Sequence, residues 1–313
     1  MSNDTDQNGE QQVLIQSLKI FCDLVDTQSF SKTAVLNDVT QSAVSQQIKS
    51  IEKRQGVLLE RHKRNITLTE EGDVFYKGAR DIVRRYEEML HRVEALDGVV
   101  SGTVRLSSIY SVGMRELGPF LQKYLKTYPK VNFRLAYNKT QKIYDDVSSS
   151  EIDFGIVAYP RSRRNIRTIP FTEDQMVVVS HPKNPLAKKK IAEMKDLSEH
   201  PLILFSQETY TRQAIDRYLR KNKVQPNIAM ELDHIDTIKD AVEVDLGISI
   251  LPSRSVELER AEGSLTTLDL RGDALIRPLG ILHKQGRSFS VAAQKLLEVL
   301  TDGKEALVSE ISE

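Results

Sequence analysis

Residues 40–53 combine short polar and basic side chains at helical spacing. Because an α-helix turns about 100° per residue, Val44, Ile48 and Ile51 fall on one face, where they can pack into a core. The opposite face carries Ser42, Gln46, Lys49 and Lys53. Hydroxyl, amide and ammonium groups are the ones that read base edges and neutralise phosphates in a DNA groove. The chemistry offered here is nucleic-acid recognition, although a solvated amphipathic helix carries the same pattern.

A cluster of positive charge overlaps this segment. Residues 49–64 hold six basic and two acidic residues, a local charge of +4, although the whole chain is neutral. The basic residues are Lys49, Lys53, Arg54, Arg61, Lys63 and Arg64. A local excess of this size attracts a phosphate backbone, whereas the neutral net charge neither favours nor excludes a nucleic-acid partner.

A second set of residues follows predicted strands in the C-terminal two thirds of the chain. Ligands of open α/β sheets bind beyond the carboxyl ends of strands, and helix N-termini at that edge can hold an anion. The candidates are Ser108, Tyr110, Ser111, Val112, Asn138, Thr140, Tyr159, Ser206, Thr209, His234, Gly247 and Ile248. Each residue alone is better explained as a helix cap, but together they favour an effector site of unidentified ligand class.

The sequence lacks the usual motifs of catalysis and metal binding. It contains no GxSxG, no HExxH, no phosphate-binding P-loop and no Cys/His pairs at metal-ligand spacing. The six His residues are dispersed. The single cysteine, Cys22, lies in an apolar helical pattern that is more typical of a buried thiol than of a redox sensor. We therefore expect no catalytic residue, no metal and no cofactor.

The elements that position the polar segment are predicted to be three short helices and a hairpin. A first helix spans 13–26, with Leu14, Leu18, Phe21 and Val25 on its apolar face. A second ends near Leu36 after an N-cap at Ser29 or Ser31. The third runs from the cap Thr40 to about Lys53, with Gly56 as its stop. Residues 58–69 alternate basic and apolar side chains, which predicts a small β-hairpin, or wing.

A long helix is predicted from about Glu70. Its apolar residues recur at alternating spacings of four and three: Phe75, Ala79, Ile82, Tyr86, Met89, Val93 and Leu96. A seam of this kind needs a partner helix. The pattern therefore favours dimerisation through this helix over packing against its own domain.

After Gly98 short apolar runs alternate with amphipathic helices. The predicted strands are 104–108, 131–137, 154–158, 176–180, 202–205, 247–251 and 279–282. The predicted helices are 112–127, 141–149, 211–221, 235–244 and 290–301. This alternation indicates the α/β class with parallel sheets.

Residues 14–72 resemble the winged helix-turn-helix of LysR-type transcriptional regulators. The matching residues, in order and without a gap, are the apolar set of the first helix, Ser29-Phe30-Ser31, Ala34, Val39–Ile48, Ile51-Glu52, Gly56–Leu58, Glu60-Arg61 and Thr67–Gly72. Thr33, Asn37 and Leu59 stand where the family usually has Ala, Leu and Phe. All three are packing positions.

The resemblance implies a set of DNA-contacting residues. It places five side chains in the groove: Gln41, Ser42, Ser45, Gln46 and Lys49. It places four on or beside the wing: Arg61, Lys63, Arg64 and Thr67. Ser31, Lys53 and Arg54 complete the candidate DNA-binding set.

The resemblance, weaker beyond the first domain, also implies an organisation for the whole chain. Its parts are a disordered tail (1–12), a winged helix-turn-helix (13–72), a dimerising linker helix (73–98) and an effector-binding domain (102–302). The last resembles periplasmic binding proteins, with lobe I formed by 102–168 plus 275–302 and lobe II by 169–270.

The expected function is that of a sequence-specific transcriptional regulator whose DNA contacts are modulated by a small molecule. Its expected partners are promoter DNA, an unidentified effector, further copies of itself in a dimer or tetramer, and RNA polymerase. Activation and repression remain open alternatives.

An alternative is a solute-binding receptor, which the C-terminal pattern would suit. The first ten residues are polar and acidic, unlike a secretory signal. No apolar run approaches the roughly 18 residues that span a bilayer. The sequence therefore favours a cytoplasmic protein with no membrane partner.

Overall fold

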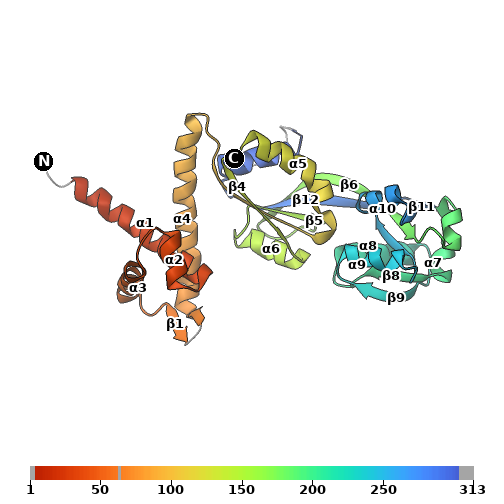
Figure 1. The fold of residues 1–313 in the computed structure, drawn as a ribbon, viewed down its shortest axis with the longest axis horizontal. Coiled ribbons are helices and arrows are strands. Elements are labelled where there is room, and N and C mark those ends of the chain that lie inside the picture. The colour runs from red at the N-terminus through yellow and green to blue at the C-terminus, as the bar shows by residue number, and fades with distance from the viewer. Residues whose placement is uncertain (1–3, 63–64, 303–313) are drawn as a thin grey trace. The chain divides into compact units, whose positions relative to one another are not determined.

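The structure is a computed structural model that describes residues 4–62 and 65–302. Lys63 and Arg64, two predicted wing residues, lie outside the described residues. The chain forms two compact units, which meet in sequence between Asp97 and Gly98 and are described one at a time. Figure 1 traces the elements of both units.

The first unit confirms the predicted order of short helices, hairpin and long helix. Its elements are α1 (Asp4–Thr27), α2 (Phe30–Leu36), α3 (Gln41–Gln55), β1 (Leu59–His62), β2 (Asn65–Leu68) and α4 (Glu70–Leu96). Helix α1 begins at Asp4, whereas the sequence analysis expected a disordered tail through residue 12. Residues 4–12 contain no proline, which would have interrupted a helix.

Local side chains set the ends of the short helices. The Ser29 hydroxyl accepts a hydrogen bond from the N–H of Lys32, and the Thr40 hydroxyl accepts one from the N–H of Ala43 at 3.2 Å. Gly56 ends α3 with φ of +91°, a conformation that costs little only for glycine. The predicted caps and stop are thus confirmed, and they fix where the polar face of α3 begins.

The core of the first unit joins all of its helices. Phe21 and Leu24 of α1 and Val44 and Ile48 of α3 are fully buried within it. The ring of Phe75 on α4 packs edge-on against Phe21, with 5.1 Å between ring centroids. The start of the long helix therefore belongs to this core.

The second unit is an α/β structure whose elements have the following bounds. The strands are β3 (Gly102–Ser108), β4 (Val131–Tyr137), β5 (Phe154–Ala158), β6 (Ile166–Ser180), β7 (Ile191–Ala192), β8 (Pro201–Phe205), β9 (Asn227–Leu232), β10 (Ser249–Pro252), β11 (Thr266–Leu270) and β12 (Ile276–Lys284). The helices are η1 (Tyr110–Val112), α5 (Met114–Thr127), α6 (Thr140–Ser148), η2 (Pro185–Lys188), α7 (Asp196–Glu199), α8 (Tyr210–Lys221), α9 (Ile235–Glu243), η3 (Ser253–Val256), α10 (Glu257–Glu262) and α11 (Val291–Leu300).

The main sheet of this unit is mixed, which corrects the expectation of parallel sheets. Its strand order is β4-β3-β5-β12-β6-β11-β7, and β10 also pairs with β6. The pairs β3–β4 and β3–β5 are parallel, whereas β12 runs antiparallel to both β5 and β6. The chain leaves the first lobe along β6 and returns along β12, so these neighbouring crossings must run in opposite directions.

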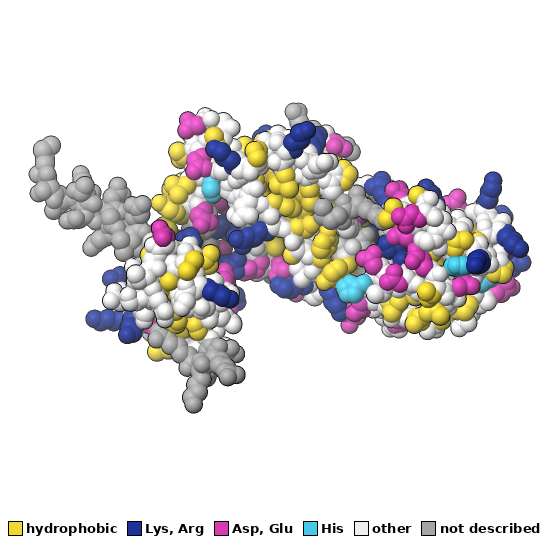
Figure 2. Space-filling model, viewed as in Figure 1, with side chains coloured by type: hydrophobic (Ala, Val, Ile, Leu, Met, Phe, Trp, Pro, Cys, Tyr) yellow, Lys and Arg dark blue, Asp and Glu magenta, His cyan; other side chains and the backbone are white. Residues whose placement is uncertain are grey.

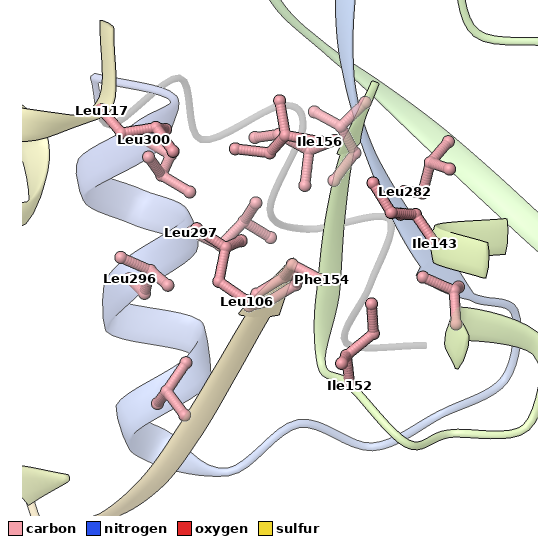
Figure 3. Packing of buried hydrophobic residues seen from close by; sticks show 14 of the residues in the cluster. Leu106, Leu117, Ile143, Ile152, Phe154, Ile156, Leu282, Leu296, Leu297 and Leu300 are labelled. Atoms are coloured by element: carbon pink, nitrogen blue, oxygen red, sulfur yellow. The ribbon is translucent and has the colours of Figure 1, made fainter. Parts of the chain in front are cut away.

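Two separate cores define the lobes. Lobe I packs α5 and α11 on one face of its sheet and α6 on the other (Figure 1). Figure 3 shows Leu296, Leu297 and Leu300 of α11 facing the strands, and Ile143 of α6 on the other side of β5. Lobe II has its own core, built from the second half of β6 and the elements between it and β12.

The boundary between the cores differs slightly from the predicted one. Ile169 of β6 still packs in the core of lobe I, and Met176 is the first β6 residue in the core of lobe II. The change of core therefore lies beyond the expected boundary at residues 168/169. Because β6 is one continuous strand paired with β12, no local sequence signal marks where one core gives way to the other.

Candidate functional site

The polar face of α3 is exposed in the first unit. Gln41, Ser42, Gln46 and Lys49 are exposed, Ser45 is partly exposed, and Val44, Ile48 and Ile51 are buried beneath them. Lys53 and Arg54, in the last turn, are also exposed. Figure 2 shows dark-blue basic side chains projecting from the surface over α3. The helix thus offers donors and cations to solvent along the side opposite its core contacts.

Two hydrogen bonds order the start of this face. The Ser31 hydroxyl donates to Oε1 of Gln41 at 3.2 Å, and the hydroxyls of Thr40 and Ser42 lie 2.9 Å apart. Ser31 therefore orients the Gln41 amide and leaves its NH₂ group pointing away from the bond. Pre-ordering polar groups in this way lowers the entropy cost of a later contact.

The wing is tied to α3 and α4 through side chains at its base. Glu52 of α3 accepts hydrogen bonds from the N–H groups of Leu58 and Leu59 at 3.3 and 3.1 Å. The Thr69 hydroxyl donates to the carbonyl of Val57 at 3.0 Å. A Cβ at Gly72 would lie 2.0 Å from the carbonyl oxygen of Leu58, so only glycine fits there. These contacts explain the roles of Glu52, Thr69 and Gly72 within the family-like motif.

The predicted wing residues are only partly described. Thr67 is exposed on β2. Arg61 lies on β1, but its side chain lies outside the described residues, as do Lys63 and Arg64 entirely. The wing backbone, with Leu59 paired to Leu68 and Glu60 to Thr67, is the scaffold that carries them.

The apolar seam of α4 divides into two parts. Ala79 is buried in the unit's own core, and Phe75 packs against that core with its side chain partly buried. Val83, which the heptad pattern did not include, is buried in the same core. Farther along, Ile82 and Met89 are each 50% exposed, Val93 60% and Leu96 86%, and Tyr86 is partly exposed. Figure 2 shows uncovered apolar side chains along α4.

The second unit contains a cavity of about 270 Å³ between its two lobes. Seven of the predicted effector residues line it: Tyr110, Ser111, Asn138, Thr140, Ser206, Thr209 and His234. The strand ends thus predicted seven of the 17 lining residues, because successive β-strands end at the same edge of the unit.

Helix N-termini converge on this cavity. Thr140 and Gln141 begin α6, Tyr210 and Thr211 begin α8, and Ile235 begins α9. Helices α6 and α9 have no side-chain cap, so their first N–H groups lack an intrahelical or capping acceptor. Helix α8 is capped by Thr209, whose hydroxyl accepts from the N–H of Arg212. The partial positive charge of these ends favours an anion in the cavity.

Two aromatic side chains that line the cavity, Tyr110 and His234, contact each other. Tyr110 stacks on Tyr137 with 5.9 Å between ring centroids and meets His234 edge-on at 4.4 Å. Because Tyr110 belongs to lobe I and His234 to lobe II, this contact crosses the cleft. Burial raises the pKa of Tyr137 above its usual range, so this side chain stays neutral.

An ion pair also crosses the cleft. Nζ of Lys139 lies 3.4 Å from a carboxylate oxygen of Glu208 and 4.0 Å from one of Asp233. The Ser206 hydroxyl donates to Asp233, a bond that lowers the pKa of the Asp233 carboxyl. Exposed pairs contribute little stability, so this one can open when a ligand enters.

Five predicted effector residues do not line the cavity. Ser108, Val112 and Ile248 are fully buried, and Ser108 donates to the carbonyl of Ile109. A Cβ at Gly247 would lie 2.4 Å from the carbonyl oxygen of Pro201, which leaves no room for a side chain, so this glycine serves a close approach of two backbone segments. The N–H of Tyr159 donates to the carbonyl of Pro278 on β12 at 2.8 Å, and burial raises the pKa of its phenol to about 12.

Other lining residues were missed by the sequence analysis: Ile109, Lys139, Gln141, Ala158, Phe205, Glu208, Tyr210, Thr211, Asp233 and Ile235. Most are direct neighbours of predicted residues, so widening each strand-end segment by one or two positions would have found them.

Membrane-spanning helices and metal clusters can be assessed for the described part of the chain only. Within residues 4–62 and 65–302, none of the helices has the length and apolar character that a membrane crossing requires. The same residues hold no cluster of three or more His, Cys, Asp or Glu side chains placed to bind a metal ion.

Two family models match the chain in the order of its units. The model described as "Bacterial regulatory helix-turn-helix protein, lysR family" matches residues 15–73. The model described as "LysR substrate binding domain" matches residues 97–305. The first match covers α3 and the wing, and the second covers both lobes around the cavity.

Known proteins are similar over nearly the same length. The chain is 30% identical over 294 residues to the HTH-type transcriptional activator CmpR of Synechocystis sp., covering 94% of this chain and 96% of that protein. Full-length OxyR from Pseudomonas aeruginosa superposes with a TM-score of 0.72 at 21% identity, covering 92% of this chain and 93% of that one. The regulatory domain of Synechocystis CcmR, solved with 2-PG, has a TM-score of 0.60 at 25% identity and covers 64% of this chain and 97% of that domain.

Proposed function

This chain belongs to the LysR family of transcriptional regulators, and on that premise we propose which of its residues bind DNA and what its cavity binds. It is a DNA-binding regulator with an effector-binding domain. The observation that carries the proposal is the pairing of an exposed polar face on α3 with a cleft on which helix N-termini converge.

DNA recognition is assigned to α3 and the wing within residues 13–72. Gln41, Ser42, Ser45, Gln46 and Lys49 would enter the major groove, where Gln can pair with adenine and Lys with guanine or phosphate. Ser31, Lys53, Arg54, Arg61, Lys63, Arg64 and Thr67 would contact the backbone or the adjoining groove. The exposure of the described α3 side chains supports this assignment.

The cavity is assigned to a small effector that carries an anionic group. The uncapped N-termini of α6 and α9 support that chemistry, and the ring of Tyr110 in the cavity lining suits a compact organic part. The similar regulatory domain of CcmR was solved with 2-PG, which makes 2-PG the first compound to test. Effector binding would shift the lobes between arrangements that differ in affinity for the ligand and for DNA.

The linker helix, within residues 73–98, is assigned to self-association into a dimer or tetramer. The exposed half of the α4 seam supports this, because such an apolar stripe is stabilised by a partner helix. A regulator of this kind acts at promoters, which implies a cytoplasmic protein that meets RNA polymerase there. No catalytic or cofactor role is assigned to any residue.

The first test is fluorescence anisotropy of the full-length protein with DNA from upstream of its own gene. Scrambled DNA of the same length serves as the control, and both are measured over a salt series. We expect tight binding to the first DNA only, with a steep loss of affinity as salt rises. Equal binding to both DNAs at every salt concentration would contradict a sequence-specific regulator.

The second test adds 2-PG to the same assay. A shift in the affinity for the upstream DNA, absent with the scrambled DNA, would support the effector assignment. A panel of small carboxylates and phosphates would follow if 2-PG has no effect. If no anion in the panel binds the protein, the anionic class of effector is wrong while the DNA-binding result stands.

A further inference from the structure

Arg277 lies on β12 directly behind the cavity and is fully buried. Its Nη2 donates to the hydroxyl of Ser111 at 2.5 Å, and its Nη1 donates to the main-chain oxygen of Ser111 at 3.4 Å. Its Nε has no hydrogen-bond partner among the described residues. Its hydrogen bonds thus go only to neutral groups, and its buried charge is offset without direct contact by the nearby carboxyls of Glu116 and Asp174.

Ser111 connects this guanidinium to the cavity. The residue lines the cavity, and its oxygen accepts the hydrogen bond from Arg277. Its own hydroxyl hydrogen can therefore be donated elsewhere. The neighbouring cation polarises the hydroxyl, which makes it a stronger donor to an anion in the cleft.

A carboxylate competes for the same cation. Glu116, in the first turn of α5, is buried, and neither of its oxygens has a hydrogen-bond partner among the described residues. The charged groups that act on it are Arg277 of β12, Asp174 of β6 and Arg254 of η3. Burial raises the pKa of Glu116 to about 7.

The other ionisable groups near Arg277 are Asp174 and Tyr159. Asp174, its register partner on β6, accepts hydrogen bonds from the Ser253 hydroxyl at 2.8 Å and the N–H of Arg254 at 3.3 Å. Tyr159, which interacts electrostatically with Arg277, is a neutral phenol whose hydroxyl has no hydrogen-bond partner among the described residues. Glu116 is therefore the group near Arg277 that gains or loses charge near neutral pH.

We propose that the anionic group of the effector binds at Ser111 and competes with the Glu116 carboxylate for the charge of Arg277, so that effector binding is coupled to uptake of one proton by Glu116. The proposal rests on the cleft being the effector site. It makes Arg277 a positioning residue that acts through Ser111. It makes Glu116 the residue that sets how affinity depends on pH.

The sign of the coupling follows from the charges. When Glu116 is ionised it offsets part of the charge of Arg277 and repels an incoming anion, and when it is protonated only Asp174 competes with the anion for that charge. Affinity for the anion therefore falls as the pH rises through about 7. A coupling of one pKa unit corresponds to about a tenfold change in affinity.

The test measures binding of inorganic sulfate to the full-length protein by titration calorimetry at pH 6.0 and pH 8.5. Sulfate keeps the same charge over this interval, so any change in affinity comes from the protein. The wild type is expected to bind sulfate about tenfold more weakly at pH 8.5, and Glu116→Gln to bind it equally at both. Calorimetry in buffers of different ionisation enthalpy should also show proton uptake in the wild type only.

Three further variants separate this mechanism from others. Glu208→Gln removes a carboxylate on the cavity rim, and His234→Gln removes the imidazole in the cavity; both should keep the difference between pH 6.0 and 8.5. Ser111→Ala should weaken binding at pH 6.0, and unchanged binding in this variant would place the anion elsewhere. Pronounced pH dependence in Glu116→Gln would overturn the proposal.

Failure of the inference can be told apart from failure of the proposed function. If the wild type does not bind sulfate at pH 6.0 but binds upstream DNA specifically, the anion site is wrong and the regulator stands. If sulfate binds with equal affinity at both pH values, the anion site stands and the coupling to Glu116 is wrong.

Discussion

Thr33 and Asn37 are polar residues at positions where the family usually has apolar ones, and the structure shows how they are tolerated. The Thr33 hydroxyl donates to the carbonyl of Ser29 at 2.8 Å and lies 2.8 Å from the hydroxyl of Thr27. The Asn37 amide donates to Asp23 at 2.8 Å. A buried polar group that keeps its hydrogen bonds costs little, so these departures preserve the helix packing that presents α3.

Gln46 is the residue whose substitution best tests the proposed recognition face. Gln46→Ala should lose about 1–3 kcal/mol of affinity for the cognate site and relax discrimination at one base pair. Gln55→Ala, at the far end of the same helix, is the matched control and should change neither. Anisotropy titrations against the cognate site and its single-base variants provide the measurement. Intact discrimination in Gln46→Ala would mean that this face of α3 is not the reading face.

Glu116 should also make the stability of the protein depend on pH. Its folded-state pKa of about 7 exceeds the ordinary value of 4.5 because of burial, so the folded state favours the protonated form. The contribution of protonated Glu116 to the free energy of unfolding is complete below about pH 4.5 and is lost as the pH rises through 7. Above that pH the ionised carboxyl costs about 3 kcal/mol, and Glu116→Gln should be more stable than the wild type by a similar amount.

Urea unfolding of both proteins at pH 5 and pH 8.5 measures this difference. The advantage of Glu116→Gln should be larger at pH 8.5. Glu257→Gln, a substitution at an exposed carboxylate at the start of α10, is the control and should show no such trend. The same advantage for Glu116→Gln at both pH values would contradict a carboxyl that titrates near neutrality.

Among the secondary-structure elements, α4 has two different roles along one helix. Its first turns pack against α1, with Phe75 against Phe21 and the phenol of Tyr76 donating to Asp26. Beyond Val83 its apolar side chains are largely uncovered. A single heptad pattern thus serves the domain's own core first and then leaves a stripe for a partner, which anchors the association surface to the DNA-binding unit.

Val93→Glu tests the second role of α4. A carboxylate on the exposed seam would have to be buried against the partner helix, so the dissociation constant of the dimer should rise by more than about tenfold. Ala95→Glu, on the opposite side of the same helix, should leave association unchanged. Sedimentation equilibrium of the three proteins measures this directly. A Val93→Glu protein that associates like the wild type would show that the seam is not the interface.

At the scale of the whole molecule, the antiparallel pair β6–β12 joins the two lobes through one shared sheet, although each lobe has its own core. The pair continues from Ile166 to Gln175 on β6, so the lobes share a stiff connection rather than two loose linkers. The cavity, the buried Arg277 and Glu116 all lie close to this crossing. A ligand that contacts both lobes therefore binds close to β6 and β12. Any change in the arrangement of the lobes has to occur about these two strands.

Thr140→Trp should fill the cavity and remove the response to effector. The bulky ring displaces a ligand from the N-terminus of α6 while the first unit is untouched, so DNA binding without effector should remain as in the wild type. Thr127→Trp, at the exposed end of α5, is the control and should respond normally. Anisotropy with and without the effector compares them. Loss of specific DNA binding in the absence of effector would show that the two functions are not separable in this way.

The local elements and the type of each unit could be predicted from the order of the residues alone. Helix caps at Ser29 and Thr40, the stop at Gly56 and the two faces of α3 follow from short-range hydrogen bonding and from 3.6-residue periodicity, and the structure bears them out. The ends of β3 and β4 located Tyr110, Ser111, Asn138 and Thr140 at the cavity for a similar reason, because neighbouring parallel strands finish at one edge.

The long-range partners of these elements became known only from the folded chain. Phe75 and Ala79 pack in the core of the first unit while Val93 and Leu96 are left uncovered, although one heptad describes all four. Arg277 lies behind Ser111, a contact across 166 positions of the chain that no local pattern indicates. Periodicity records which face of an element is apolar, whereas the partner that covers the face depends on how distant segments pack.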